Sequence, residues 1–182
     1  MKGKDHYDLN CIDHKTKYIT AHLFVEKRTL LKCVEFLQQI KITCYDQILE
    51  RYAQQEKIIF VCDKFGNYKG AFNKLFSHVA KLRFGVPIKA KVVGLEHNNN
   101  PIERYNGKIK DRIKVMRGGF RSVQGAEDFL NLKHIIHNFV NPHLQIQEKT
   151  PAEVAEIDLK LGSNKLLKII GKRAKERHHS LR

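Results

Sequence analysis

The sequence lacks the features that define several protein classes. No apolar run approaches the roughly 18 residues needed to cross a bilayer, and no signal peptide opens the chain. We therefore expect a protein that neither spans a membrane nor is exported by that route. The four cysteines show no C-x-x-C spacing and lie mostly in apolar segments, which favours reduced core thiols in a cytoplasmic protein. Internal repeats and low-complexity linkers are also absent.

Acidic residues are few, and they are unevenly distributed along the chain. The chain carries 34 Lys and Arg against 19 Asp and Glu, a formal charge of +15. Residues 1–63 are nearly balanced, whereas residues 64–91 hold seven basic groups and no acidic one. Residues 101–121 and 165–182 carry further basic excess. Such blocks indicate a nucleic acid or an acidic surface as partner, and the alternative is a generally basic protein such as a ribosomal one.

Hydrophobic periodicity predicts alternating strands and helices. Polar–apolar alternation and short apolar runs predict strands over 6–12, 17–26, 57–62 and 88–93, and the first two form a hairpin. Helical spacing occurs over 30–37, 45–52, 68–79, 101–116 and 124–140. The string Thr150-Pro-Ala-Glu153 has the spacing of a capping box. A basic segment from residue 164 onward is helical at first.

Two acidic residues occupy positions that would suit ligand-binding or metal-ligating carboxylates. Asp63 follows the buried strand over 57–62, and ligands of open α/β sheets collect at the carboxyl ends of strands. Asp after a strand is equally often a simple turn former. Glu103 lies in the first turn of the helix over 101–116, where the helix dipole keeps a carboxylate ionised. A lone carboxylate beside a basic helix face suggests a metal ligand held next to a polyanion, although an ordinary surface helix is the plainer interpretation.

Histidine offers a weaker signal for metal. His134 and His137 could belong to a zinc site, but no second ligand pair has matching spacing, so a structural role is favoured.

Several strings, taken in order, resemble the DDE transposases of bacterial and archaeal insertion sequences. They are C-D-K-F-G-N-Y, H-N-N-N-P-I-E-R-Y-N-G-K-I-K-D-R-I-K-V-M-R-G-G-F, N-F-V-N-P-H and K-T-P-A-E-V-A. The resemblance covers nearly the whole chain. It implies an α/β fold of the RNase H-like type, in which a mixed central sheet is flanked by helices. The catalytic domain would span residues 1–145, and residues 146–182 would form a helical basic tail.

The resemblance also implies a site. Asp63 matches the second catalytic aspartate of the family and Glu103 its catalytic glutamate, 40 positions later. Such carboxylates would hold two Mg²⁺ or Mn²⁺ ions, which activate a water or a DNA 3′-hydroxyl for in-line displacement. The side chains expected to contact DNA are Asn100, Arg104, Lys108, Lys110, Lys114 and Arg117. Phosphate contacts of this kind position DNA without reading its sequence.

The chain departs from the family pattern at its start. The family's first aspartate lies on a strand that precedes a turn like Lys2-Gly3-Lys4, and this strand is not in the sequence. Asp5 and Asp8 match that aspartate poorly, and Asp13 matches a non-catalytic position. Since that strand is central in the fold, its absence would leave two buried strand edges without partners. We expect an incomplete transposase, either decayed or completed by an upstream-encoded segment, and inactive alone.

These expectations name partners and alternatives. The partners are the DNA of transposon ends and target, and a homo-oligomer if the protein is functional, in the nucleoid-associated cytoplasm of a bacterium or archaeon. A non-catalytic basic DNA-binding remnant is the main alternative, and a nuclease acting on RNA–DNA hybrids is a weaker one.

Overall fold

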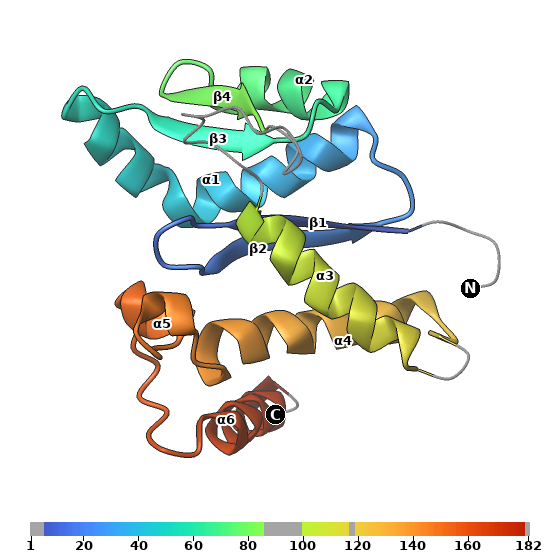
Figure 1. The fold of residues 1–182 in the computed structure, drawn as a ribbon. Coiled ribbons are helices and arrows are strands. Elements are labelled where there is room, and N and C mark those ends of the chain that lie inside the picture. The colour runs from blue at the N-terminus through green and yellow to red at the C-terminus, as the bar shows by residue number, and fades with distance from the viewer. Residues whose placement is uncertain (1–5, 86–99, 117–118, 181–182) are drawn as a thin grey trace. The chain divides into compact units, whose positions relative to one another are not determined.

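The computed structural model describes residues 6–85, 100–116 and 119–180, with Asn100 and residues 173–180 described by backbone alone. Small sheets and helices alternate along the chain (Figure 1). The elements are β1 (Tyr7–Ile12), β2 (Ile19–Val25), α1 (Leu30–Ala53), β3 (Ile58–Cys62), α2 (Gly66–Leu75), β4 (Ala80–Phe84), α3 (Asn100–Lys114), α4 (Val123–Ile135), a π-helix (Ile136–Val140), a 3₁₀ turn (Leu144–Ile146), α5 (Pro151–Val154) and α6 (Lys165–Ser180). The chain is therefore a mixed α/β protein, as predicted.

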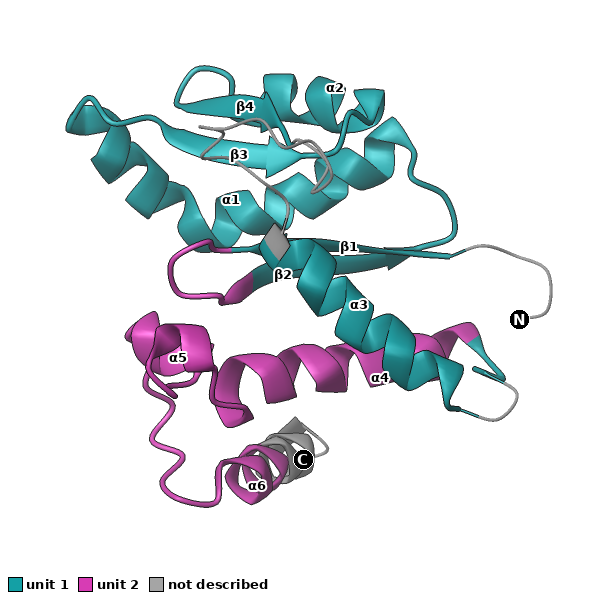
Figure 2. Cartoon of the chain, viewed as in Figure 1, with its two compact units in different colours: residues 1–12, 20–122 teal, residues 13–19, 123–182 magenta. Residues whose placement is uncertain are grey.

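The chain divides into two compact units (Figure 2). The first comprises residues 1–12 and 20–122, and the second comprises residues 13–19 and 123–182. The strand predicted over 88–93 and the turn over 2–4 lie outside the described residues.

The core of the first unit forms where α1 packs on α2. The Thr29 hydroxyl caps α1 by accepting a hydrogen bond from the Lys32 amide, at 3.3 Å. Cys33, Phe36, Leu37 and Ile40 of α1 are buried together with Ala71 and Phe72 of α2. A Cβ at Gly70 would lie only 3.0 Å from the Leu30 side chain. Glycine at this position thus permits the close approach of α2 to the start of α1.

Parallel pairing joins β3 to β4, from Ile58 opposite Ala80 to Cys62 opposite Phe84. The Phe60 ring of β3 lies 5.0 Å from the Phe76 ring and 5.5 Å from the Phe72 ring, centroid to centroid. These aromatic contacts tie the strand to the core of α1 and α2. The carboxyl end of β3, and hence the residue after it, is positioned by this packing.

The hairpin of β1 and β2 forms a sheet of its own. The strands are joined by the short segment 13–18, which only antiparallel pairing allows. Among the described residues, the β1–β2 sheet and the β3–β4 sheet are two-stranded and share no strand.

In the second unit, the π-helix that follows α4 holds the segment that connects the two strands of the hairpin. The buried Asn138 side chain accepts from the Ile19 amide at 2.9 Å and donates to the Ile19 carbonyl at 3.0 Å. The buried His137 ring contacts the Lys17 carbonyl at 2.8 Å through Nε2. His137 therefore has a structural contact of the kind that the sequence favoured.

The capping box predicted at Thr150 is confirmed. Its hydroxyl accepts from the Glu153 amide at 3.4 Å, and the Glu153 carboxylate accepts from the Thr150 amide at 2.8 Å. Lys165 of α6 approaches the other carboxylate oxygen to 2.6 Å. These partners, the lysine first, lower the pKa of Glu153 to about 2.

Three elements differ from the sequence prediction. The helical patterns over 30–37 and 45–52 belong to one helix, because the buried Ile40 continues the apolar face between them. The helix expected over 68–79 ends at Leu75, and a turn leads from it into β4, which was not predicted. Lys81 and Arg83 are exposed on this five-residue strand, so its sequence lacks the apolar run that predicted β3. The helix expected over 124–140 changes to a π-helix at Ile136.

Glu153→Gln should lower the free energy of unfolding near neutral pH, because it removes the capping carboxylate and its lysine partner. Since the group is half exposed, we expect a loss of about 0.5–1 kcal/mol. The folded-state pKa lies below the ordinary value of about 4.3, so this stabilisation is present above that pH and is lost as pH falls through about 2. Urea titrations at pH 7 and pH 2 test this; an equal difference between variant and parent at both values would contradict it.

Candidate active site

Asp63 stands directly after β3, with much of its side chain open to solvent. One carboxylate oxygen accepts from the Phe65 amide at 3.3 Å, and the other lies 3.4 Å from the Arg28 guanidinium. The side chain is 55% exposed. The turn-forming role left open by the sequence is thus present, and it leaves the carboxylate accessible to a ligand.

Arg28, which the sequence analysis did not single out, lies against Asp63. Its guanidinium carbon is 4.3 Å from the centroid of the Phe65 ring and 4.8 Å from that of the Tyr7 ring. The Asn67 side chain donates to the Arg28 carbonyl at 2.8 Å. Arg28 is remote from Asp63 in sequence, in the segment between β2 and α1, so no local spacing could have connected the two.

Burial determines the protonation state of the Cys62 thiol, which directly precedes Asp63 in the chain. Desolvation, reinforced by the charge of Asp63, raises the pKa of Cys62 to about 11. The thiol is consequently protonated near neutral pH, and thiolate chemistry is not a property of this end of β3.

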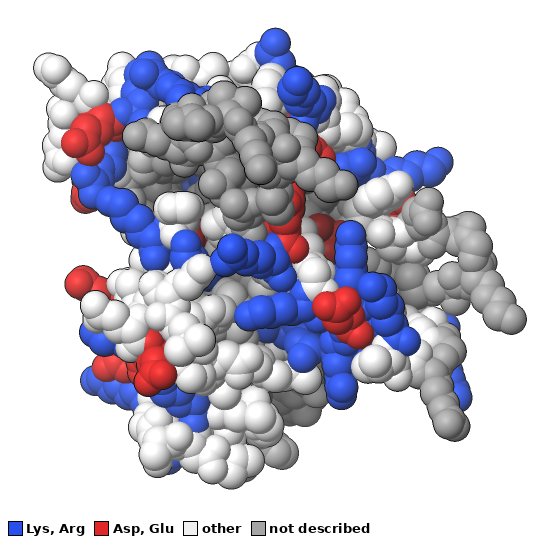
Figure 3. Space-filling model, viewed as in Figure 1, with Lys and Arg blue, Asp and Glu red and all other residues white. Residues whose placement is uncertain are grey.

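Helix α3 presents Glu103 on a basic surface. Tyr105 and Ile109 of its predicted apolar face are buried, whereas Glu103 is exposed in the first turn. Lysine and arginine side chains gather over α3 (Figure 3). The predicted DNA-contacting residues that are described and exposed on this helix are Arg104, Lys108, Lys110 and Lys114.

A polar network joins α3 to β1. The Asn10 side-chain Nδ2 donates to the Asp8 carboxylate at 2.9 Å and to the side-chain Oδ1 of Asn106 at 3.2 Å. Burial, with the charge of Asp8 as a lesser cause, raises the pKa of Tyr105. These contacts hold the helix that carries Glu103 against the hairpin.

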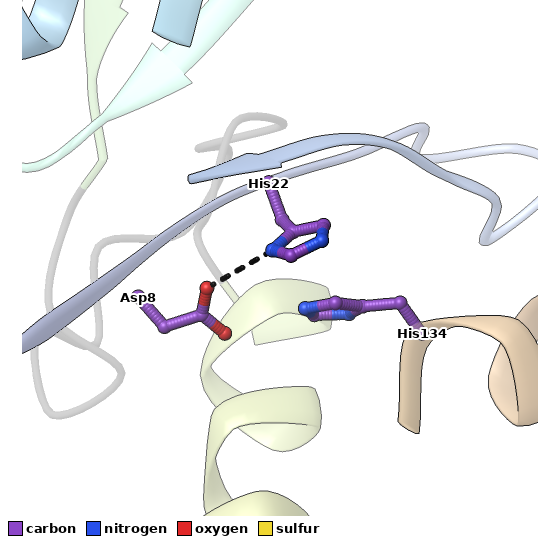
Figure 4. A group of neighbouring side chains, drawn as sticks. All are labelled: Asp8, His22 and His134. Atoms are coloured by element: carbon purple, nitrogen blue, oxygen red, sulfur yellow. Dashed lines mark ion pairs between the residues drawn. The ribbon is translucent and has the colours of Figure 1, made fainter. Parts of the chain in front are cut away.

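The Asp8 carboxylate also lies beside His22 of β2, 3.5 Å from Oδ1 to Nδ1, and the two form an ion pair when the imidazole is protonated (Figure 4). Both side chains are mostly buried. Figure 4 also draws His134, which lies buried in α4 of the second unit. Residue spacing could not associate Asp8 with His22, because the two side chains come together only after β1 and β2 have formed the hairpin.

The predicted site residues are only partly assembled. Among the described side chains, those of residues 6–85, 101–116 and 119–172, neither Asp63 nor Glu103 belongs to a cluster of three that could ligate a metal. Asn100 begins α3, but its side chain lies outside the described residues, as does Arg117. Asp13 accepts hydrogen bonds from the Lys15 and Thr16 amides, at 3.1 and 2.6 Å, and so acts as a turn former.

Comparison with known proteins decides the family. The family model DDE_Tnp_IS240, described as a DDE domain, matches residues 1–143. The chain belongs to this family of DDE-type insertion-sequence transposases. No curated protein matches it.

Membership of this family supports a transposase role and implies DNA as a partner. Transposases of this family typically use a divalent metal. The mixed α/β structure with small sheets is consistent with a DDE domain. Among the helices of the described segments, none is long and apolar enough to cross a membrane.

Asp63→Asn and Glu103→Gln should leave the fold nearly unchanged. Both carboxylates are exposed, and Asp63 meets Arg28 through one long contact, so each substitution should alter the free energy of unfolding by less than about 1 kcal/mol. Phe76→Ala is the matched contrast: it empties a fully buried position and should cost about 3–5 kcal/mol. Urea denaturation of the three variants measures this. A loss at Asp63 as large as that at Phe76 would show that Asp63 holds the fold together.

Proposed function

We propose that this chain is the catalytic domain of an insertion-sequence transposase, with Asp63 and Glu103 as two of its catalytic carboxylates. The reaction would be metal-dependent cleavage of DNA and joining of a DNA 3′ end to a target. The observation that carries the proposal is the exposed carboxylate of Asp63 at the carboxyl end of β3, within a chain matched by the DDE family model.

The two carboxylates fit the metal that the family uses. Mg²⁺ and Mn²⁺ prefer a few carboxylate oxygens, completed by water and phosphate oxygens, to a closed protein cage. Asp63 and Glu103 are both exposed enough to leave room for such ligands. When two cations are bound, an attacking water or 3′-hydroxyl is activated and the charge on the leaving oxygen is stabilised.

The basic face of α3 supports DNA binding next to this chemistry. Arg104, Lys108, Lys110 and Lys114 are exposed on the helix that carries Glu103. Lysine and arginine side chains position a duplex by contacts to phosphate. The proposed surface includes Asn100 and Arg117 on the strength of the sequence alone.

We further propose an RNase H-like fold that is completed by one more strand, between the hairpin and β3. The support is that β1–β2 and β3–β4 are separate two-stranded sheets in the described residues, whereas that fold has one central sheet. An inserted strand would pair with the open edges and would carry the first aspartate. An upstream-encoded segment is the proposed source.

Transposase activity should depend on that strand. The chain as it stands should show little or no nicking of supercoiled plasmid in Mn²⁺. The same chain extended by the residues encoded directly upstream, where these form a strand ending in Asp, should nick the plasmid and join element ends to it. Glu103→Ala in the extended chain should abolish both reactions, because a metal-ligating carboxylate is lost.

The controls for that experiment lie within the same chain. Glu50→Ala removes an exposed carboxylate from the last turn of α1 and should leave nicking unchanged. Robust nicking by the unextended chain, abolished by Glu103→Ala, would contradict the requirement for a further aspartate. Activity of the extended chain that survives both Asp63→Asn and Glu103→Ala would contradict the proposed site.

The second candidate function is DNA binding without catalysis, which the basic surface of α3 favours (Figure 3). It predicts metal-free binding of a short duplex that weakens steeply between 50 and 200 mM salt, since counterions are released at each phosphate contact. Replacing Lys108, Lys110 and Lys114 together by Gln should reduce the slope of log K against log salt by about 2–3. Fluorescence anisotropy measures both effects. Affinity independent of salt would rule out this electrostatic interface.

The remaining expectations belong to the same proposal. Residues 1–145 would act as the catalytic domain and residues 146–182 as a basic helical tail. Joining two DNA ends to one target would require a homo-oligomer, in the nucleoid-associated cytoplasm of a bacterium or archaeon.

A further inference from the structure

Arg28 is held beside Asp63 by contacts to both of its ring neighbours. The guanidinium carbon lies 4.3 Å from the Phe65 ring centroid and 4.8 Å from the Tyr7 ring centroid, within the range of cation–π attraction. The hydrogen bond from Asn67 to the Arg28 carbonyl and the capping of α1 by Thr29 fix the backbone on which the side chain stands. The guanidinium is therefore positioned before any ligand arrives.

Toward the described part of the chain, most of the N–H donors of Arg28 make no hydrogen bond. A guanidinium has five N–H donors along its edges, and stacking on aromatic rings uses its faces instead. Among the described residues, its hydrogen-bond partner is Asp63, through one N–H at 3.4 Å. This distance is longer than that of a strong charge-assisted hydrogen bond, and the side chain is 32% exposed.

A single long contact does not account for so ordered an arginine. An exposed ion pair of this geometry contributes little to stability, so the rings rather than Asp63 hold the guanidinium. What the arrangement offers is a planar set of donors, partly open to solvent, next to the carboxylate proposed for catalysis. A tetrahedral oxyanion with two adjacent oxygens matches that fork, and a DNA phosphate is such a group.

We propose that Arg28 binds a phosphate of the DNA strand engaged at Asp63. This inference rests on the proposed function, since it requires DNA to reach the end of β3. Arg28 would thus act as a substrate-positioning residue that fixes one phosphate beside Asp63. The Asp63 charge opposes an anion at this place in the absence of metal, so its removal should strengthen metal-free binding through Arg28.

The first test compares two neighbours that carry the same charge. Arg28→Gln and the matched control Lys27→Gln each remove one positive charge from the same segment, and Lys27 is exposed. Binding of the full chain to a labelled 20-base-pair duplex would be followed by anisotropy in EDTA. We expect Arg28→Gln to weaken binding about tenfold and to reduce the salt slope by about 1, with a clearly smaller effect for Lys27→Gln. Asp63→Asn should strengthen binding, but not when Arg28→Gln is also present.

The outcomes separate the two proposals. If the parent chain binds no DNA, the proposed function fails, and this inference fails with it. If the parent binds DNA but Arg28→Gln and Lys27→Gln weaken binding equally, Arg28 is only structural and this inference alone is overturned. Arg28→Lys keeps the charge but not the planar fork, and should restore the salt slope without full affinity.

A second measurement needs no variant and so does not depend on how Arg28→Gln folds. Phenylglyoxal modifies accessible arginines, and mass spectrometry reports each site in the parent chain with and without duplex. We expect DNA to slow modification of Arg28 severalfold and to leave Arg51 unaffected; Arg51 is half exposed and is paired with Glu56 at 2.8 Å. Equal protection of the two arginines would overturn the proposal.

Discussion

The placement of Asp63 depends on the packing of one phenylalanine, Phe60, against the helices behind β3. Its ring contacts Phe72 and Phe76, and Phe76 is fully buried. Apolar burial of this size contributes far more to stability than any contact of the exposed carboxylates, so the aromatic core determines where β3 ends. The same core includes Cys33 and Phe36 of α1 and hence also supports the segment that leads into that helix. The same aromatic core therefore positions both Asp63 and Arg28.

The proposed catalytic carboxylates and the buried core contribute very differently to the stability of the fold. Asp63 and Glu103 are exposed and contribute little to folding, whereas the residues that place them are buried. An exposed carboxylate at the end of a strand, without a strong partner, keeps the lone pairs that a metal or a donor could use. The proposed function and the stability of the fold therefore depend on different residues.

The sequence predicted the local features well and the non-local ones poorly. Alternation located β2, a short apolar run located β3, the helical pattern located α3 with Tyr105 and Ile109 inward, and the capping box at Thr150 formed as expected. Local spacing contains this information because strands, helices and caps are set by nearby residues. The strand β4 was missed because two of its five residues are charged and exposed. Arg28 was missed because its contacts to Tyr7 and Asp63 join three segments that meet only in the folded chain.

The distribution of charge connects the proposed chemistry to the proposed binding. Glu103 shares α3 with Arg104 and Lys108, and Asp63 lies beside Arg28, so each proposed catalytic carboxylate has cations near it in sequence or space. Cations so placed reduce the repulsion between a carboxylate and an approaching phosphate, which lets DNA reach a site that would otherwise reject it. Arg28 is stacked on aromatic rings and meets Asp63 through one long contact, so a phosphate could take up its donors at little cost. In the proposed function, basic residues so placed would serve both as partners of the carboxylates and as ligands of DNA phosphates.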